Sequence, residues 1–190
     1  MGIAEVFIAL SHKLCYNWIS EWNNCAHDAR KEVLVPRTLS TQDMRDHGVN
    51  FGGREMDNGE LRFSLTVRGS GYVWTESSKA RGEWQNAHYH LGVGELYIVQ
   101  YGRMAFVTQS ADGTRHVRIL LPGDMVATVT GEHHNVYLFP DSGIHTVKHG
   151  MPVGNPEKNG ADWYPADLVF DAWTKKLSEE DIYFQALQKQ

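Results

Sequence analysis

The stretch Gly82–Gly102 reads GEWQNAHYHLGVGELYIVQYG, and it places His88 and His90 one residue apart before Glu95. In a strand, side chains two residues apart point to the same face, so both imidazoles can reach one ion. The turn at residues 91–94 can swing the chain back and bring Glu95 to the same ion. The stretch therefore predicts three ligands of a divalent transition-metal site.

A second stretch, from Gly123 to His134, supplies the fourth ligand. A strand expected near Met125–Val129 leads to Gly131 and then to an adjacent pair of histidines. We select His134 by spacing, because His133 would point the other way in an extended chain. Three imidazoles and one carboxylate suit Fe, Mn, Zn, Ni or Co, so one divalent transition metal is the predicted cofactor and its identity stays open.

These two stretches resemble the two motifs of the cupin superfamily. The first motif is matched at Gly82, His88, His90, Glu95 and Gly102. The second is matched in spacing at Gly123, Gly131 and His134, with Val129 where a proline is usual. The resemblance covers about residues 61–149 and implies a jelly-roll barrel, or double-stranded β-helix. The alternative for the histidines is a barrel that has lost its metal and keeps them as hydrogen-bonded side chains.

The rest of the chain predicts a mainly β, single-domain barrel with helical ends. Apolar and polar residues alternate over Leu61–Val67, which is typical of a strand. Turn residues separate further expected strands at 72–75, 96–100, 104–108, 116–121, 125–129, 136–139 and 146–149, with a last strand at 168–170. The many short strands favour an antiparallel sandwich or barrel. Glycines at 48, 52, 53 and 59 are interpreted as turns.

Helical periodicity appears at both ends of the chain. We divide it into an N-terminal helical extension (1–36) that packs on the barrel, the barrel itself (37–173) and a C-terminal helix (174–190). Ser40 and Ser178 are expected to cap helices. The N-terminal extension carries two tryptophans in its apolar stripe, and we expect it to cover the barrel or a second copy in a homodimer.

Composition narrows the class of partner. The chain has 190 residues, 42% hydrophobic and 22% charged, with a net charge of -5 and no basic run, which disfavours nucleic acid and anionic membranes. Cys15 and Cys25 form no CxxC pair, so we expect a reducing, cytoplasmic location. The N-terminus is interpreted as a helix and not as a signal peptide, and no apolar run is long enough to span a membrane.

A second resemblance bears on the reaction. The stretches Gly59–Val67, Glu95–Tyr97 and Tyr164–Asp167 are similar to the cupin-type phosphoglucose isomerases. The resemblance implies a metal-dependent isomerase or epimerase of a small sugar or sugar phosphate. In it, Glu95 is both ligand and proton shuttle, Tyr164 is catalytic and Thr66 contacts phosphate. Residues 83–87 depart from the threonine-rich stretch of that family, so the sugar substrate is expected to differ.

Two further residues are candidates for substrate binding. Tyr97 lies close to the ligands in sequence. Its ring either stacks on a bound sugar or packs inside the barrel. His145 is expected at the mouth of the barrel. Two other functions stay open: an Fe(II)-dependent dioxygenase, which the same ligands permit, and a non-catalytic cupin that binds a sugar or another small ligand.

Overall fold

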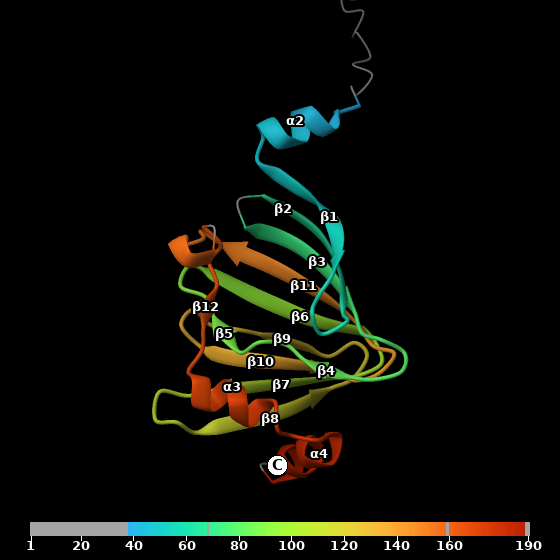
Figure 1. The fold of residues 1–190 in the computed structure, drawn as a ribbon, viewed down its shortest axis with the longest axis vertical. Helices are drawn as coiled ribbons and strands as arrows, with labels where there is room; N and C mark the ends of the chain where they lie inside the picture. The colour runs from blue at the N-terminus through green and yellow to red at the C-terminus, as the bar shows by residue number, and fades with distance from the viewer. Residues whose placement is uncertain (1–37, 68, 159, 189–190) are drawn as a thin grey trace, which may run out of the picture. The chain divides into compact units, whose positions relative to one another are not determined.

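The structure, a computed structural model, describes residues 38–188 except 68 and 159, and Ser40–Gln190 forms one compact unit. The predicted N-terminal helix at 1–36 lies outside the described residues. The unit is built from two six-stranded antiparallel sheets (Figure 1). The first contains, in order, β1 (Val49–Glu55), β2 (Leu61–Val67), β3 (Ser70–Glu76), β11 (Gly143–Gly150), β6 (Val93–Tyr101) and β9 (Met125–Ala127). The second contains β12 (Tyr164–Pro165), β5 (His88–Tyr89), β10 (His133–Leu138), β7 (Met104–Gln109) and β8 (Arg115–Leu120), with β4 (Glu83–Trp84) paired to β10. The mainly β prediction is confirmed.

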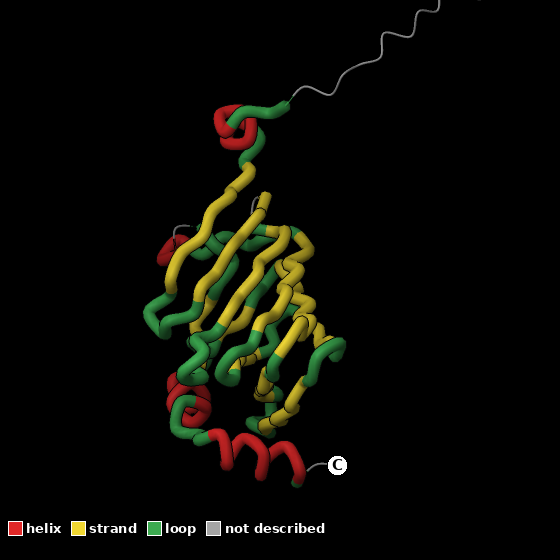
Figure 2. Tube along the Cα trace, turned by 90° about the vertical axis from the view of Figure 1, so that its right-hand side faces the viewer, coloured by secondary structure: helices red, strands yellow, loops and turns green. Residues whose placement is uncertain are grey.

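One apolar core fills the space between the sheets. It includes Val99 from the first sheet and Phe106 and Val136 from the second, all nearly inaccessible to water. A second cluster lies on the other face of the second sheet, where helices α3 (Leu168–Thr174) and α4 (Glu179–Leu187) cover it. Phe170 and Ile182 anchor these helices and are fully buried, which stabilises the fold by about 1.5–3 kcal/mol each. Helix α4 packs against β8 (Figures 1 and 2).

At β2, the first sheet has an exposed apolar outer face and a polar inner face. Along β2, apolar and polar residues alternate with a period of two: the apolar Leu61, Phe63, Leu65 and Val67 are all exposed. Arg62, Ser64 and Thr66 point to the opposite face, where they line a pocket. The alternation of the sequence therefore separates an apolar outer surface from the polar wall of a site.

Cross-strand register brings distant residues into one row on this inner wall. Thr66 pairs with Gly71, Gly71 with Lys148, and Lys148 with Glu95. Gly71 has a φ of +141°, and a Cβ there would lie 2.4 Å from the backbone oxygen of Leu65. A glycine is thus required where the chain turns into β3.

Two local predictions are wrong. The glycines at 52 and 53 were expected in turns, but they lie inside β1, which pairs with β2 along seven consecutive positions. Those ladder hydrogen bonds outweigh the weak strand propensity of glycine. Residues 168–170 begin helix α3, because the Asp167 side chain accepts the N–H of Val169 at 2.8 Å and caps it.

The predicted helix caps are confirmed. Ser40 closes a capping box with Asp43 at the start of the short helix α2 (Thr41–Asp46). Ser178 does the same with Asp181 at the start of α4. In both, the serine hydroxyl accepts the backbone N–H of the aspartate, and the aspartate carboxylate accepts the backbone N–H of the serine. These two bonds satisfy two free donors at the start of the helix.

Candidate metal centre

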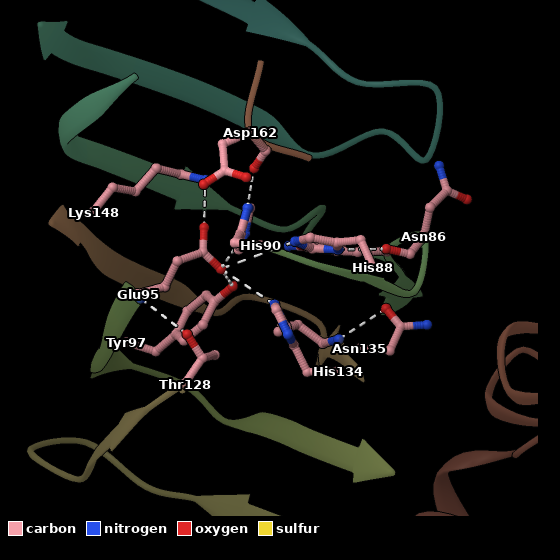
Figure 3. Close-up of polar contacts among 12 residues, drawn as sticks. Asn86, His88, His90, Glu95, Tyr97, Thr128, His134, Asn135, Lys148 and Asp162 are labelled. Atoms are coloured by element: carbon pink, nitrogen blue, oxygen red, sulfur yellow. Dashed lines mark hydrogen bonds and ion pairs between the residues drawn. The ribbon is translucent and has the colours of Figure 1, made fainter. Parts of the chain in front are cut away.

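The predicted ligands converge in the structure. His88, His90, Glu95 and His134 each offer one ligand atom, and these four atoms lie within 4.8 Å of one another. His88 and His90 come from β5 and its end, Glu95 from β6 and His134 from β10, so both sheets contribute (Figure 3). All four residues are buried, with exposures of 0–6%. The sequence prediction that His134, and not His133, points inward agrees with this placement, since His133 stacks on Tyr89.

The imidazoles are oriented by backbone carbonyls. Nδ1 of His88 lies 2.8 Å from the oxygen of Asn86, and Nδ1 of His134 lies 2.9 Å from the oxygen of Glu132. Nδ1 of His90 bonds to the backbone oxygen of Asp162. A carbonyl can only accept, so each ring donates from Nδ1 and turns the lone pair of Nε2 toward the centre. Such hydrogen bonds fix the tautomer and the direction of metal-binding histidines.

The four ligand atoms lie close enough together to share one cation. Oε2 of Glu95 lies 3.2 Å from Nε2 of His90, 3.2 Å from that of His134 and 3.9 Å from that of His88. Lone pairs facing a carboxylate repel it, and Nε2 of His90 has no hydrogen-bond partner among the described residues. Burial, then His134, lowers the pKa of His88 well below 6.5, which favours the neutral ring and leaves the Nε2 lone pair available to a metal ion. The residues therefore fit a divalent metal ion, whose identity the donor set leaves open.

Glu95 is held at both oxygens of its carboxylate and at its backbone N–H. The Tyr97 hydroxyl donates to Oε2 at 2.5 Å, while Lys148 pairs with Oε1. The N–H of Glu95 donates to the hydroxyl oxygen of Thr128 at 2.9 Å. Burial by itself raises the pKa of Glu95, but the positive charge of Lys148 acts against burial, and the pKa is held well below its usual value. The carboxylate therefore stays ionised, as a ligand must.

Asp162 fixes the turn between the second histidine and the glutamate. Its carboxylate accepts the backbone N–H groups of Leu91 at 2.9 Å, Gly92 at 2.8 Å and Val93 at 2.8 Å. These bonds outweigh burial and hold the pKa of Asp162 below its usual value. The same residue's backbone oxygen holds His90 (Figure 3). One aspartate thus positions both the turn and a ligand.

The cluster opens into a pocket of about 1190 Å³. His88, His90 and Glu95 lie in its wall, as do the predicted substrate residues Thr66 and Tyr97. The wall also contains Lys148, Ser64, Thr146, Trp163, Arg54 and Arg62. The ring of Trp163 stacks on His88 at 5.4 Å. Hydroxyls, cations and an aromatic face together suit a polar, oxygen-rich ligand.

Two predicted site residues do not reach this pocket. His145 lies on the outer face of β11, where it bonds to the Tyr72 hydroxyl at 2.7 Å and to Gln100 at 2.9 Å. The odd–even alternation of the strand turns it away from Thr146. Tyr164 stacks on Tyr89 at 5.4 Å and its hydroxyl donates to a backbone oxygen outside the pocket wall.

Sequence reasoning missed several residues of the wall. Arg62 shares the strand face of Thr66, so the alternation of β2 is a signal that would have found it. Lys148 reaches Glu95 only through the pairing of β11 with β6. Asp162 and Trp163 lie in a loop, and nothing in the local sequence indicates their contacts.

Comparison with known proteins places the fold. No protein-family model and no curated protein matches the chain. Among solved structures, a tryptophan-to-phenylalanine variant of oxalate decarboxylase from B. subtilis matches with a TM-score of 0.50 and 14% identity, over 80% of this chain and 47% of the decarboxylase. The cupin domain of Drosophila melanogaster CENP-C matches with a TM-score of 0.46 and 12% identity, over 60% of this chain and 84% of that domain. KdgF from Halomonas sp. matches with a TM-score of 0.42 and 19% identity, over 51% of this chain and 85% of that protein.

The chain is thus a mainly β protein with a cupin-like fold, two antiparallel sheets and short helices. It carries a buried His/His/Glu/His cluster of the kind that binds a metal ion. At these identities the comparisons establish the fold alone. Within the described part of the chain, no helix is both long and apolar enough to cross a bilayer.

Proposed function

We propose that this chain is a metal-dependent enzyme that isomerises or epimerises a small sugar or sugar phosphate. The observation that carries the proposal is the buried cluster of three imidazole Nε2 atoms and one carboxylate, which opens into a pocket whose wall carries hydroxyls and cations. His88, His90, Glu95 and His134 would hold one divalent transition metal. The similarity of Gly59–Val67 and Glu95–Tyr97 to the cupin-type phosphoglucose isomerases supports the choice of reaction.

When the reaction is an isomerisation, it is an internal redox exchange between two carbons; an epimerisation would remove a proton from one carbon and return it to the opposite face of the same carbon. A bound divalent cation would supply Lewis acidity that polarises a neighbouring carbonyl and hydroxyl of the sugar. A proton leaves the hydroxyl-bearing carbon and is added to the carbonyl carbon, while the hydroxyl proton passes to the former carbonyl oxygen. No outside oxidant is needed. Ser64, Thr66 and Thr146 line the wall and can bind the sugar's hydroxyl groups.

Glu95 and Lys148 are the groups we assign to proton transfer. The low pKa of Glu95 suits a ligand and makes its carboxylate a weak base on its own. Lys148 pairs with Oε1, the oxygen turned away from the histidines, and lines the pocket. The proton shuttle predicted for Glu95 is therefore proposed to act as a pair with Lys148. Tyr164 and His145 are left out, because neither lies in the pocket wall.

The test uses the full chain loaded with Mn, Fe or Zn and a panel of aldoses, ketoses and their phosphates. NMR detects conversion and, in D₂O, deuterium at the carbon that gains the proton. We expect turnover with at least one sugar, a loss of at least about a hundredfold per bound metal ion in Lys148→Met, and wild-type turnover in Lys79→Met, a surface control. No turnover combined with oxygen uptake by the Fe(II) form would replace the proposal with a dioxygenase. Sugar binding without turnover would replace it with a binding protein.

A homodimer remains a proposal. The sequence argument for it rests on the N-terminal segment, which lies outside the described residues. The exposed apolar side chains of β2, among them Phe63 and Leu65, give it independent support, because large exposed apolar patches mark interaction surfaces. Size-exclusion chromatography with light scattering tests it, and a monomer at micromolar concentration would contradict it.

A further inference from the structure

Two arginines face one another on the wall of the pocket. β1 and β2 pair antiparallel, and their register sets Arg54 directly opposite Arg62. Directly opposed residues of an antiparallel pair lie on one face of the sheet, and both arginines line the pocket. Like charges placed directly opposite one another destabilise a sheet unless something of opposite charge lies between them.

Only one of the two arginines is compensated by the described residues. Nη2 of Arg62 pairs with Oε2 of Glu60 at 2.8 Å, and Glu60 is 1% exposed. Gln85 donates to both oxygens of Glu60 at 3.1 Å, which holds the carboxylate in place. Arg54, by contrast, has no ion pair or hydrogen bond with any described residue. The trio of Arg54, Arg62 and Glu60 therefore leaves one positive charge.

Arg62 also has one N–H donor, at Nε, that makes no hydrogen bond with the described residues. This donor is buried. A buried donor without a partner costs free energy, and such a group in a pocket wall is the kind of site that a ligand satisfies. Glu60 holds Nη2 of Arg62, so the guanidinium keeps its place in the pocket wall before any ligand arrives.

This pair lies in the wall of the pocket into which the candidate metal centre opens, because His88, His90 and Glu95 lie in the same wall. Thr66, on the same face of β2 as Arg62, belongs to the cross-strand row that ends at Glu95. A ligand bound at the centre can therefore extend along the inner wall toward β1 and β2.

We propose that Arg54 and Arg62 form an oxyanion subsite that holds the phosphate or carboxylate end of the substrate. The inference rests on the proposed function and narrows it to a phosphorylated or acidic sugar. Two guanidinium groups in one wall present forked donors that match such oxyanions. Glu60 acts as the positioning residue that aims Arg62.

The test measures anion binding by the metal-free full chain, so its outcome does not depend on metal loading or on turnover. Inorganic phosphate and acetate are titrated separately by calorimetry at pH 8, in the wild type, Arg54→Gln, Arg62→Gln and Arg118→Gln. Arg118 is an exposed arginine on β8 of the other sheet and serves as the charge-matched control. Arg54 is exposed, so its substitution leaves the buried network intact.

We expect at least one of the two anions to bind the wild type. The same anion should bind Arg54→Gln about tenfold more weakly, because one charge-assisted hydrogen bond is lost. Arg118→Gln should bind as the wild type does. Preference for phosphate identifies a phosphorylated sugar, and preference for acetate identifies a sugar acid. Binding that is unchanged in Arg54→Gln, or absent from the wild type with both anions, would overturn the subsite. If the subsite fails while metal-dependent turnover persists, the proposed function stands without it.

Discussion

Replacing Asp162 with alanine removes the carboxylate that holds the turn between His90 and Glu95. Three backbone N–H groups donate to it at 2.8–2.9 Å, and the residue is 7% exposed. A hydrogen bond to a charged group contributes about 1.5–3 kcal/mol. Water can enter the space that the truncated side chain leaves, so we expect about 3–5 kcal/mol in total and not the full sum.

Thermal unfolding of the metal-free protein measures this loss. A domain of this size loses about 2–4 °C of Tm for each kcal/mol, so Asp162→Ala should lower Tm by about 6–20 °C at pH 7. The pKa of Asp162 is lower in the folded protein than in the unfolded chain. Its contribution is therefore full above about pH 4 and is lost as the pH falls through the folded pKa, so the difference between variant and wild type should shrink there.

A matched control is Asp112→Ala. Asp112 also accepts a backbone N–H, that of Thr114 at 2.9 Å, but it lies exposed in a hairpin turn. Its substitution should change Tm far less. If Asp162→Ala and Asp112→Ala lowered Tm equally, or if the Asp162 effect persisted unchanged at pH 3, the role of this carboxylate as the clamp of the turn would be refuted.

Three further outcomes follow from the geometry. The metal-free protein should lose stability as the pH falls below about 6.5. Burial and His134 lower the pKa of His88, so the unfolded chain binds a proton that the folded chain excludes. Urea denaturation at several pH values should show that the free energy of unfolding falls less steeply between about pH 6.5 and 5 in His88→Gln than in the wild type. Tyr97→Phe should keep the fold but weaken metal binding about 10–100-fold in competition titrations, because the hydroxyl that orients Glu95 is gone. Gly71→Ala should destabilise the protein in urea by more than about 1 kcal/mol, since its φ of +141° and the close backbone oxygen exclude a Cβ; an unchanged midpoint would contradict that strain.

The sequence predicts the cluster well because its information is local. His88 and His90 follow strand period, and the short glycine turn before Glu95 leaves few ways to place the carboxylate. The capped helices are equally local, since Ser40 and Ser178 carry their partners three residues on. Fold class follows from the same short-range alternation and turn residues.

What sequence reasoning missed depends on pairing between distant strands. Lys148 meets Glu95 only because β11 and β6 are in register, and Arg54 meets Arg62 only because β1 is a strand. Because the glycines at 52 and 53 were interpreted as turns, strand β1 was not predicted, and Arg54 was not recognised as a residue of the wall. Tyr164 was assigned a role from a resemblance of short motifs, whereas the neighbouring Trp163 is the residue whose ring faces the cluster.

The most direct test of the account is the metal affinity of the purified chain. Calorimetric titration of the chelator-treated protein with Zn or Mn should give one ion per chain. His134→Gln, at a position fully buried beside Glu95, should weaken binding at least about 100-fold. His116→Gln, an exposed histidine on β8, should bind as the wild type does. Equal affinity in His134→Gln and wild type, or no binding by the wild type with either metal, would contradict the central claim.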